Sequence, residues 1–215
     1  MLDKARYVVV EGPIGAGKTS LARRLAAELQ AGTMFEEAEK NPFLGRFYQN
    51  TERWAMPTQL SFYLQRIDQL AAHARSVGED AERKVVADFI IDKDRLFADL
   101  NLSGDELALY DRITSGLARP ELPKPDLVIY LQAKPETLME RIRRRGMESE
   151  RRITESYLER VAERYTRFFY DYDAAPLFVV DAGVLNPVDH DDDFALLLER
   201  LRNMRGYREF FAFAG

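Results

Sequence analysis

The stretch Glu11-Gly12-Pro13-Ile14-Gly15-Ala16-Gly17-Lys18-Thr19 contains the complete pattern G-x-x-x-x-G-K-[ST] at residues 12–19. The apolar run 7–10 before it predicts a buried strand, and residues 19–30 after it have the composition and spacing of a helix. Strand, glycine loop and helix in this order form a P-loop, in which backbone N–H groups and a helix N-terminus surround a phosphate. The sequence therefore predicts that the chain binds a nucleoside triphosphate.

The P-loop also predicts which residues hold the triphosphate and its metal ion. We expect Lys18 to reach the β- and γ-phosphates and Thr19 to bind Mg²⁺ through its hydroxyl. The remaining phosphate-binding positions act mainly through their backbone and are Gly12, Gly15, Ala16, Gly17 and Ser20.

Length and composition limit the classes of protein that need to be considered. The 215 residues are enough for one α/β domain, and no change in composition divides them. A formal net charge of −5 argues against binding to a nucleic-acid polymer, and the absence of cysteine excludes disulfides and thiolate metal sites. No apolar run is long enough to span a membrane, so we expect a cytoplasmic protein with no membrane partner.

Short β-rich runs alternate with longer helical patterns along the whole chain. This alternation predicts an α/β fold, a parallel sheet flanked by helices as in P-loop kinases. Strands are expected at 8–11, 33–35, 85–88, 127–131 and 177–180, and helices at 19–30, 58–76, 103–117, 135–145, 155–174 and 192–204. The acidic run 189–193 suits the N-terminal end of the last helix. His73 and His190 show no motif spacing and are expected on the surface.

An arginine-rich segment, residues 141–153, stands out in this acidic chain. Cations on a mobile lid could neutralise the charge of a migrating phosphoryl group and exclude water, so the P-loop favours a lid here. The alternative is a solvated helix face whose arginines pair with nearby glutamates. The cations are Arg141, Arg143, Arg144, Arg145, Arg151 and Arg152.

Carboxylates follow three of the predicted strands, at the edge of the sheet where α/β proteins bind their ligands. Glu11 ends the first strand, and Glu36 and Glu37 follow the second. A carboxylate there could accept a proton from an acceptor hydroxyl as its oxygen attacks the γ-phosphate. Asp88 ends the third strand and is a candidate for positioning Mg²⁺, although an apolar strand ending in Asp also occurs by chance.

Beyond the P-loop, the chain resembles the deoxynucleoside kinases, especially the bacterial branch with deoxyadenosine and deoxyguanosine kinases. The resemblance covers most of the chain. It rests on residues 11–19, on Asn-Pro-Phe-Leu at 41–44 with Phe47 and Tyr48, on Arg-Trp-Ala at 53–55, on Gln59, Arg66 and Arg141, and on residues 125–133, 135–137 and 145–150.

The resemblance implies a role for particular residues in binding and phosphorylating a deoxynucleoside. Glu36 would be the base for the 5′-hydroxyl, with Glu37 as the alternative if the short stretch is shifted by one residue. Tyr48 and Glu150 would hold the sugar 3′-hydroxyl, and Gln59 would pair with the base edge. Five further residues are implied: Phe97 as a wall for the base, Trp54 near the sugar, Arg66 close to the base, and Arg141 and Arg145 in the lid.

The chain departs from the family pattern at the end of the third strand. Relatives have an acidic residue followed by Arg and Ser, whereas this chain reads Ala87-Asp88-Phe89. Lys93 or Arg95 could replace the charge of the missing arginine. Met147 also stands where relatives carry a second lid arginine, for which Arg144 or Arg151 could substitute.

Together these features predict a kinase that uses Mg²⁺ and transfers the γ-phosphate of ATP to the 5′-hydroxyl of a deoxynucleoside. Two alternatives remain: a nucleoside-monophosphate kinase of the thymidylate type, which needs further cations for the acceptor's phosphate, and a nucleotide-binding regulator without turnover. The resemblance also implies a homodimer. The base preference and the choice between ATP and GTP stay open.

Overall fold

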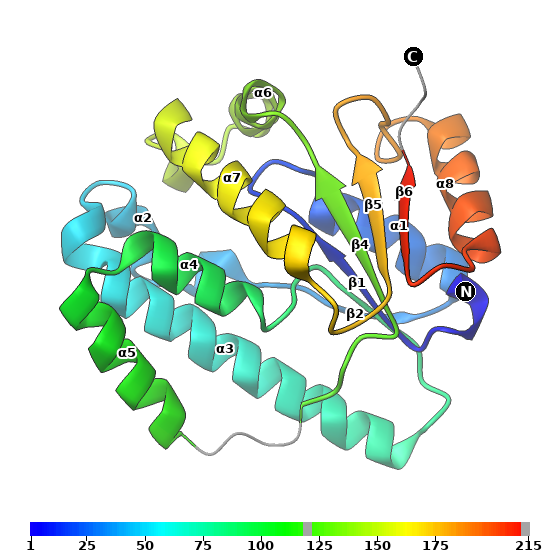
Figure 1. The fold of residues 1–215 in the computed structure, drawn as a ribbon, viewed down its shortest axis with the longest axis horizontal. Helices are drawn as coiled ribbons and strands as arrows, with labels where there is room; N and C mark the ends of the chain where they lie inside the picture. The colour runs from blue at the N-terminus through cyan, green and yellow to red at the C-terminus, as the bar shows by residue number, and fades with distance from the viewer. Residues whose placement is uncertain (118–121, 212–215) are drawn as a thin grey trace.

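The structure of the protein is a computed structural model that describes residues 1–117 and 122–211. A six-stranded sheet with strand order β2-β3-β1-β4-β5-β6 forms its centre, and every neighbouring pair of strands is parallel (Figure 1). The strands are β1 (Tyr7–Glu11), β2 (Gly32–Met34), β3 (Val85–Ala87), β4 (Leu127–Gln132), β5 (Leu177–Asp181) and β6 (Arg208–Phe211).

Helices cover both faces of this sheet. They are α1 (Lys18–Leu29), α2 (Leu44–Phe47), α3 (Thr51–Glu79), α4 (Lys93–Asn101), α5 (Gly104–Gly116), α6 (Pro135–Arg145), α7 (Glu155–Asp171) and α8 (Asp191–Asn203). Helix α1 packs on β1, β2 and β3, and ion pairs join it to α8, whereas α7 packs on β4 from the other side and contacts α4 (Figure 1). The predicted fold class is therefore confirmed.

The strands are buried on both faces, which explains their continuous apolar runs. All five residues of β1 are buried, and the register pairs Val9 with Ala87 of β3 on one side and with Val128 of β4 on the other. Tyr130 of β4 stacks on Phe169 of α7 with ring centroids 4.1 Å apart. The sheet is thus fixed on the α7 side by aromatic packing.

Most predicted elements are present, with shifted boundaries, and three were missed. Helix α3 starts at Thr51 and continues through Pro57, where the sequence pattern suggested a start at residue 58. Its N-terminus is capped by Asn50, whose side chain accepts a hydrogen bond from the Arg53 backbone. Helices α2 and α4 and the edge strand β6 were not predicted.

The two histidines have different environments. His190 is exposed as expected and lies 3.6 Å from Asp193. The prediction for His73 was wrong, because it is 6% exposed and packs against the Tyr7 ring with centroids 4.9 Å apart. His73 follows Tyr63, Arg66 and Leu70 at helical spacing on the buried face of α3, and the assignment of this histidine to the surface left that spacing out.

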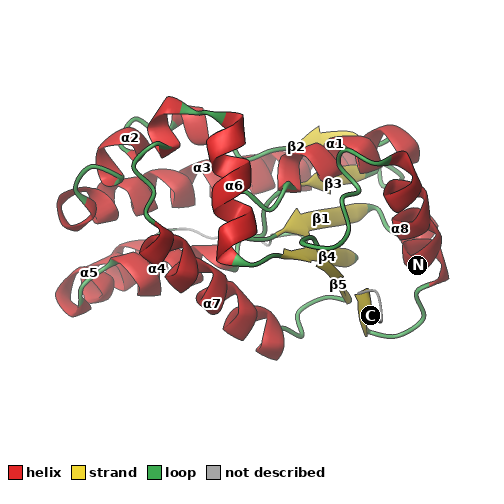
Figure 2. Cartoon of the chain, turned by 90° about the horizontal axis from the view of Figure 1, so that it is seen from above, coloured by secondary structure: helices red, strands yellow, loops and turns green. Residues whose placement is uncertain are grey.

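The carboxyl ends of β1, β2 and β3 lie at one edge of the sheet (Figure 2). The P-loop follows β1 there, Glu36 follows β2 and Asp88 follows β3. Helices α2, α3, α4 and α6 surround this edge (Figure 2). None of the described helices has an apolar stretch long enough to cross a membrane.

Candidate active site

The P-loop has a backbone that only glycine adopts readily at two positions. Gly15 has a φ of +85° and Gly17 a φ of +96°. A Cβ on Gly15 would lie 2.7 Å from the backbone oxygen of Leu138 in α6, so the loop also needs glycine to pack closely beneath that helix. Lys18 opens α1 and donates a hydrogen bond to the Pro13 carbonyl at 3.1 Å. The loop is thereby held in the form that binds phosphate.

Thr19 and Asp88 bring two oxygen ligands together beside the P-loop. The Thr19 hydroxyl donates to Asp88 Oδ2 at 2.5 Å, and Asp88 Oδ1 accepts from the Glu36 backbone N–H at 2.7 Å. Hydroxyl and carboxylate oxygens are the hard ligands that Mg²⁺ prefers. Within residues 1–117 and 122–211, no cluster of three or more His, Cys, Asp or Glu side chains could hold a metal ion. The pair therefore fits an ion whose remaining ligands are water and substrate phosphates.

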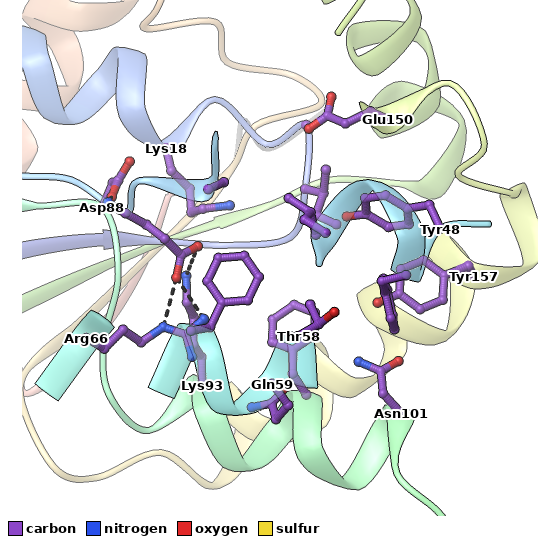
Figure 3. A pocket seen from close by; sticks show the side chains of 18 of the residues that line it. Lys18, Tyr48, Thr58, Gln59, Arg66, Asp88, Lys93, Asn101, Glu150 and Tyr157 are labelled. Carbon is purple, nitrogen blue, oxygen red and sulfur yellow. Dashed lines mark hydrogen bonds and ion pairs between the residues drawn. The ribbon is translucent and has the colours of Figure 1, made fainter. Parts of the chain in front are cut away.

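Glu36 is held by two cations, Arg66 and Lys93, which Figure 3 labels. Arg66 donates from Nε to Glu36 Oε1 at 2.8 Å and places Nη2 2.7 Å from the same oxygen, while Lys93 Nζ lies 3.1 Å from Oε2. Burial acts to raise the pKa of Glu36, but Arg66 and then Lys93 outweigh it and lower the pKa to about 2. The carboxylate is therefore ionised at neutral pH.

Asp94 extends this network toward α5. Arg66 Nη1 donates to its Oδ1 at 2.8 Å, the amide nitrogen of Gln59 donates to the same oxygen at 2.8 Å, and the Tyr110 hydroxyl donates to Oδ2. Asp94 is only 5% exposed, and burial raises its pKa. A buried carboxylate with three donors holds both Arg66 and Gln59 in place.

A cavity of about 160 Å³ opens next to these residues. Figure 3 shows charged side chains at one end of it and polar and aromatic side chains at the other. The charged end contains Lys18, Arg66, Asp88 and Lys93, and the opposite end contains Tyr48, Asn101 and Tyr157. Burial, and then the neighbouring Tyr157 and Glu150, raise the pKa of Tyr48 well above its usual value, so its hydroxyl stays protonated. The cavity can therefore take a neutral polar ligand whose reacting end faces the P-loop.

The arginine-rich segment divides between the site and the solvent. Arg141 donates to the Ala182 carbonyl at 2.7 Å and to the P-loop carbonyl of Ala16 at 3.5 Å. Arg145 lines the cavity and donates to both oxygens of Glu150, at 2.5 and 2.6 Å. The exposed Arg143 and Arg144 pair with Glu155 and Asp189. Arg141 and Arg145 thus lie against the P-loop and the cavity, and Arg143 and Arg144 lie on a solvated face with acidic partners, while the mobile lid stays a prediction.

Most of the predicted acceptor residues line the cavity, and Trp54 does not. Trp54 stacks on Phe43 with centroids 5.9 Å apart, and the Arg46 guanidinium lies 4.9 Å from its ring, so it packs beside the cavity. Glu37 pairs with Lys40 and lies outside the cavity. The predicted residues that do line it are Gly15, Lys18, Thr19, Glu36, Tyr48, Gln59, Arg66, Asp88, Phe97, Arg145 and Glu150.

Other residues of the site were missed. Thr58 lines the cavity, and its buried hydroxyl has no hydrogen-bond partner among the described residues. Its position next to Gln59 in a predicted helix was the signal that could have identified it. The missed residues that line the cavity include Phe62, Asn101, Tyr157 and Tyr165, which come from three different helices, α3, α4 and α7, and which no local motif connects.

A P-loop, an ionised carboxylate and an adjoining cavity define a phosphotransferase of the P-loop kinase class. A family model described as deoxynucleoside kinase matches residues 8–204. The chain belongs to the deoxynucleoside kinase family.

Individual relatives agree with this assignment. The chain is 36% identical over 167 residues to a deoxyguanosine kinase of Bacillus subtilis, covering 76% of this chain and 78% of the relative. It is 29% identical over 195 residues to a deoxyadenosine/deoxycytidine kinase of the same organism, covering 86% and 88%. The solved structure of the M. mycoides deoxyadenosine kinase with dCMP and dCDP bound superposes with a TM-score of 0.79 at 25% identity, covering 92% of this chain and all of that one.

The protein is therefore an enzyme that phosphorylates deoxynucleosides, as the sequence predicted. Neither alternative is favoured, because the curated relatives are deoxynucleoside kinases and not monophosphate kinases or regulators.

Proposed function

We propose that the enzyme transfers the γ-phosphate of ATP to the 5′-hydroxyl of a deoxynucleoside, with Glu36 accepting the hydroxyl proton. The observation that carries this proposal is the position of the Glu36 carboxylate. It lines the acceptor cavity together with Lys18 of the P-loop, and two cations keep it ionised. Glu36 is thus the base available where a nucleoside hydroxyl would meet the γ-phosphate.

The donor half of the reaction uses the P-loop. Lys18 supplies a positive charge to the β- and γ-phosphates, and the backbone of residues 12–20 surrounds them. Thr19 and Asp88 would hold Mg²⁺, which supplies charge neutralisation on the phosphates when it is bound. Arg141 and Arg145 of α6 add positive charge beside the P-loop and the cavity, where the transferred group would pass.

The acceptor half uses the polar and aromatic end of the cavity. Tyr48 and Glu150 are the candidates for the sugar 3′-hydroxyl, since a phenol can donate to it and a carboxylate can accept from it. Gln59 and Phe97 are the candidates for contacts to the base, by hydrogen bonding and by packing. Arg66 supports this half indirectly, because its guanidinium is bound by Glu36 and Asp94.

A nucleoside suits this cavity better than a nucleoside monophosphate. An acceptor phosphate needs cations of its own, but Arg66 and Lys93 face Glu36, and Arg145 is paired with Glu150. This charge distribution supports phosphorylation at the 5′-hydroxyl.

Substitution of Glu36 by Gln tests the assignment of the base. With ATP and Mg²⁺, wild type should phosphorylate at least one of deoxyguanosine, deoxyadenosine, deoxycytidine and thymidine, and none of their monophosphates. Loss of a positioned general base should lower kcat by about 10²–10⁴-fold while KM for the nucleoside changes little. A Glu37→Gln variant is the matched control and should keep the wild-type rate. Equal rates for the two variants would contradict the proposal.

We further propose that the protein is cytoplasmic. We also propose that it forms a homodimer through α3 and α5. Leu64 of α3 and Leu109 of α5 are 47% and 52% exposed, and Leu117, which follows α5, is 38% exposed. Helices α3 and α5 contact each other, so these side chains belong to neighbouring elements. Sedimentation of wild type and of a Leu64→Glu/Leu109→Glu variant tests this, and an unchanged mass would contradict it.

A further inference from the structure

The end of β3 lacks a cation that could act on the transferred phosphate. Asp88 is followed by Phe89, whose side chain is completely buried. Phosphoryl transfer depends on positive charge around the equatorial oxygens of the migrating group. Two arginines line the cavity in the described part of the chain, and carboxylates bind both: Arg66 by Glu36 and Asp94, Arg145 by Glu150.

Lys93, which belongs to helix α4, places an ammonium group near the end of β3. It is the first residue of α4, its side chain is 2% exposed, and its Nζ lies 6.0 Å from the centre of the Phe89 ring. Lysine is almost never buried to this degree unless its charge is compensated. The first turn of α4 therefore carries a buried cation beside the residue that follows Asp88.

The Lys93 ammonium is only partly satisfied by hydrogen bonds. Among the described residues it makes one, to Glu36 Oε2 at 3.1 Å. Glu11 Oε2 is 3.6 Å away, and the Glu11 carboxylate already accepts from the backbone of Gly12 and Ile90 and from the Tyr165 hydroxyl. An ammonium has three N–H donors, so two remain for a ligand in the cavity that Lys93 lines.

Charged groups from several elements lie around Lys93. Glu11 comes from β1, Lys18 from α1, Arg66 from α3, and Glu36 and Asp88 follow β2 and β3. Lys18 of the P-loop lines the same cavity as Lys93, so the two ammonium groups face the same space. That space lies between the P-loop and the carboxylate proposed as the base.

We propose that Lys93 is a catalytic residue that takes the place of the missing arginine, with one N–H on Glu36 and the others on the 5′-oxygen and the transferred phosphoryl group. This inference rests on the proposed function. In the step, the 5′-O–H bond breaks and its proton passes to Glu36, while the bond from the 5′-oxygen to the γ-phosphorus forms. The bond from that phosphorus to the β,γ-bridging oxygen breaks, and its electron pair leaves with ADP. Lys93 stays protonated and stabilises the charge on the oxygens.

The test compares Lys93→Met with Arg95→Met, a matched variant on the same helix whose side chain is 55% exposed and bonded to Asp99 and Asp111. Rates are measured with ATP, Mg²⁺ and the deoxynucleoside that wild type uses best. Loss of a preorganised donor to the transition state should lower kcat by about 10²–10³-fold in Lys93→Met, with KM for both substrates within about threefold, while Arg95→Met keeps the wild-type rate. A kcat within threefold of wild type for Lys93→Met overturns the inference.

The pH dependence separates a direct role from an effect through Glu36. Arg66 remains on Glu36 in the variant, so Glu36 stays ionised between pH 7 and pH 9 and the loss of kcat should persist over this range. A loss that disappears by pH 9 overturns the inference, because Lys93 would then act only by ionising Glu36. Ethylamine should restore part of the rate of Lys93→Ala in proportion to its concentration, and failure to do so counts against direct contact.

Two further results also have a defined interpretation. If Lys93→Met does not fold, as judged by its circular dichroism, Lys93→Gln takes its place, since it keeps a hydrogen bond to Glu36 without the charge. A full rate in that variant also overturns the inference. If wild type phosphorylates no deoxynucleoside, the proposed function fails first, and this result is distinct from an active wild type with an unaffected Lys93→Met.

Discussion

Replacement of Arg66 by Met should show how strongly the active-site carboxylates depend on one cation. The Arg66 side chain is 3% exposed and makes contacts of 2.7–2.8 Å with Glu36 and Asp94. Methionine keeps much of the side-chain volume but removes the charge and all of these donors. The side chains of Glu36 and Asp94, which are 18% and 8% exposed with Arg66 in place, would lose the guanidinium that lies between them.

The structure sets the size of the effect. Removing one partner of a buried, hydrogen-bonded ion pair costs about 3–5 kcal/mol, because the remaining charge stays desolvated. For a chain of this length, about 1 kcal/mol corresponds to a shift in Tm of about 2–4 °C, so Tm should fall by about 6–20 °C at pH 8. Arg95→Met removes an arginine of α4 that is 55% exposed and paired at the surface, and should change the free energy of unfolding by less than about 1 kcal/mol.

The destabilisation caused by Arg66→Met should depend on pH. In wild type the pKa of Glu36 is lowered from 4.5 to about 2, so its contribution to stability is present above pH 4.5 and is lost as the pH falls toward 2. In the variant, the Arg66 charge no longer opposes the effect of burial. The pKa values of Glu36 and Asp94 therefore rise. The folded state then binds more protons than the unfolded state near pH 5, and the destabilisation should be smaller at pH 5 than at pH 8.

Urea denaturation followed by the fluorescence of Trp54, the single tryptophan, measures the free energy of unfolding of each variant at the two pH values. Circular dichroism confirms that each variant is folded before denaturation. The reasoning is refuted if Arg66→Met is within about 1 kcal/mol of wild type at pH 8, or if its deficit grows on going to pH 5.

Two more substitutions test the donor side. Gly15→Ala should weaken ATP binding and cost roughly 1–3 kcal/mol of stability, because its φ of +85° and a Cβ at 2.7 Å from the Leu138 carbonyl both oppose a side chain; unchanged ATP binding by calorimetry would contradict this. Asp88→Asn should raise the Mg²⁺ concentration that gives half-maximal activity by about 10–100-fold, since a carboxylate next to Thr19 is lost; a Mg²⁺ titration with the wild-type midpoint would exclude the proposed metal role.

The strands and helices that could be predicted are those whose apolar residues form the core. Strands such as β1 and β4 are apolar along their length because both faces are covered, and their runs were recognised within a residue or two. Helix α6 was predicted with the observed bounds, because Pro135 at its start and Gly146 after its end are strong boundary signals.

Helix α4 could not be found in this way, because it buries charges. Lys93 and Asp94 are 2% and 5% exposed, whereas hydrophobic periodicity assumes that charged residues face solvent. Their burial depends on partners in other elements, such as Glu36 and Arg66, which sequence spacing does not bring together. The start of α3 was hidden for a different reason: a proline at position 57 is normally read as a break, yet the helix continues through it.

The candidate site divides in the same way, into residues of one local motif and residues that only folding brings together. The P-loop is local, so all of its residues were identified from one motif. The family resemblance supplied distant positions such as Tyr48 and Gln59, which line the cavity, but also Trp54, which does not. Thr58 and Tyr157 were missed because only the folded chain brings α3 and α7 to the same cavity.

The ion pair between Arg145 and Glu150 has a thermodynamic consequence for the order of events at the site. Both oxygens of Glu150 accept from Arg145. A sugar hydroxyl that donates a hydrogen bond to Glu150 competes with this guanidinium and frees part of it for an anion. Any preference of the liberated Arg145 for donor phosphates then makes the two substrates bind cooperatively, and the coupling free energy is the same whichever of them binds first.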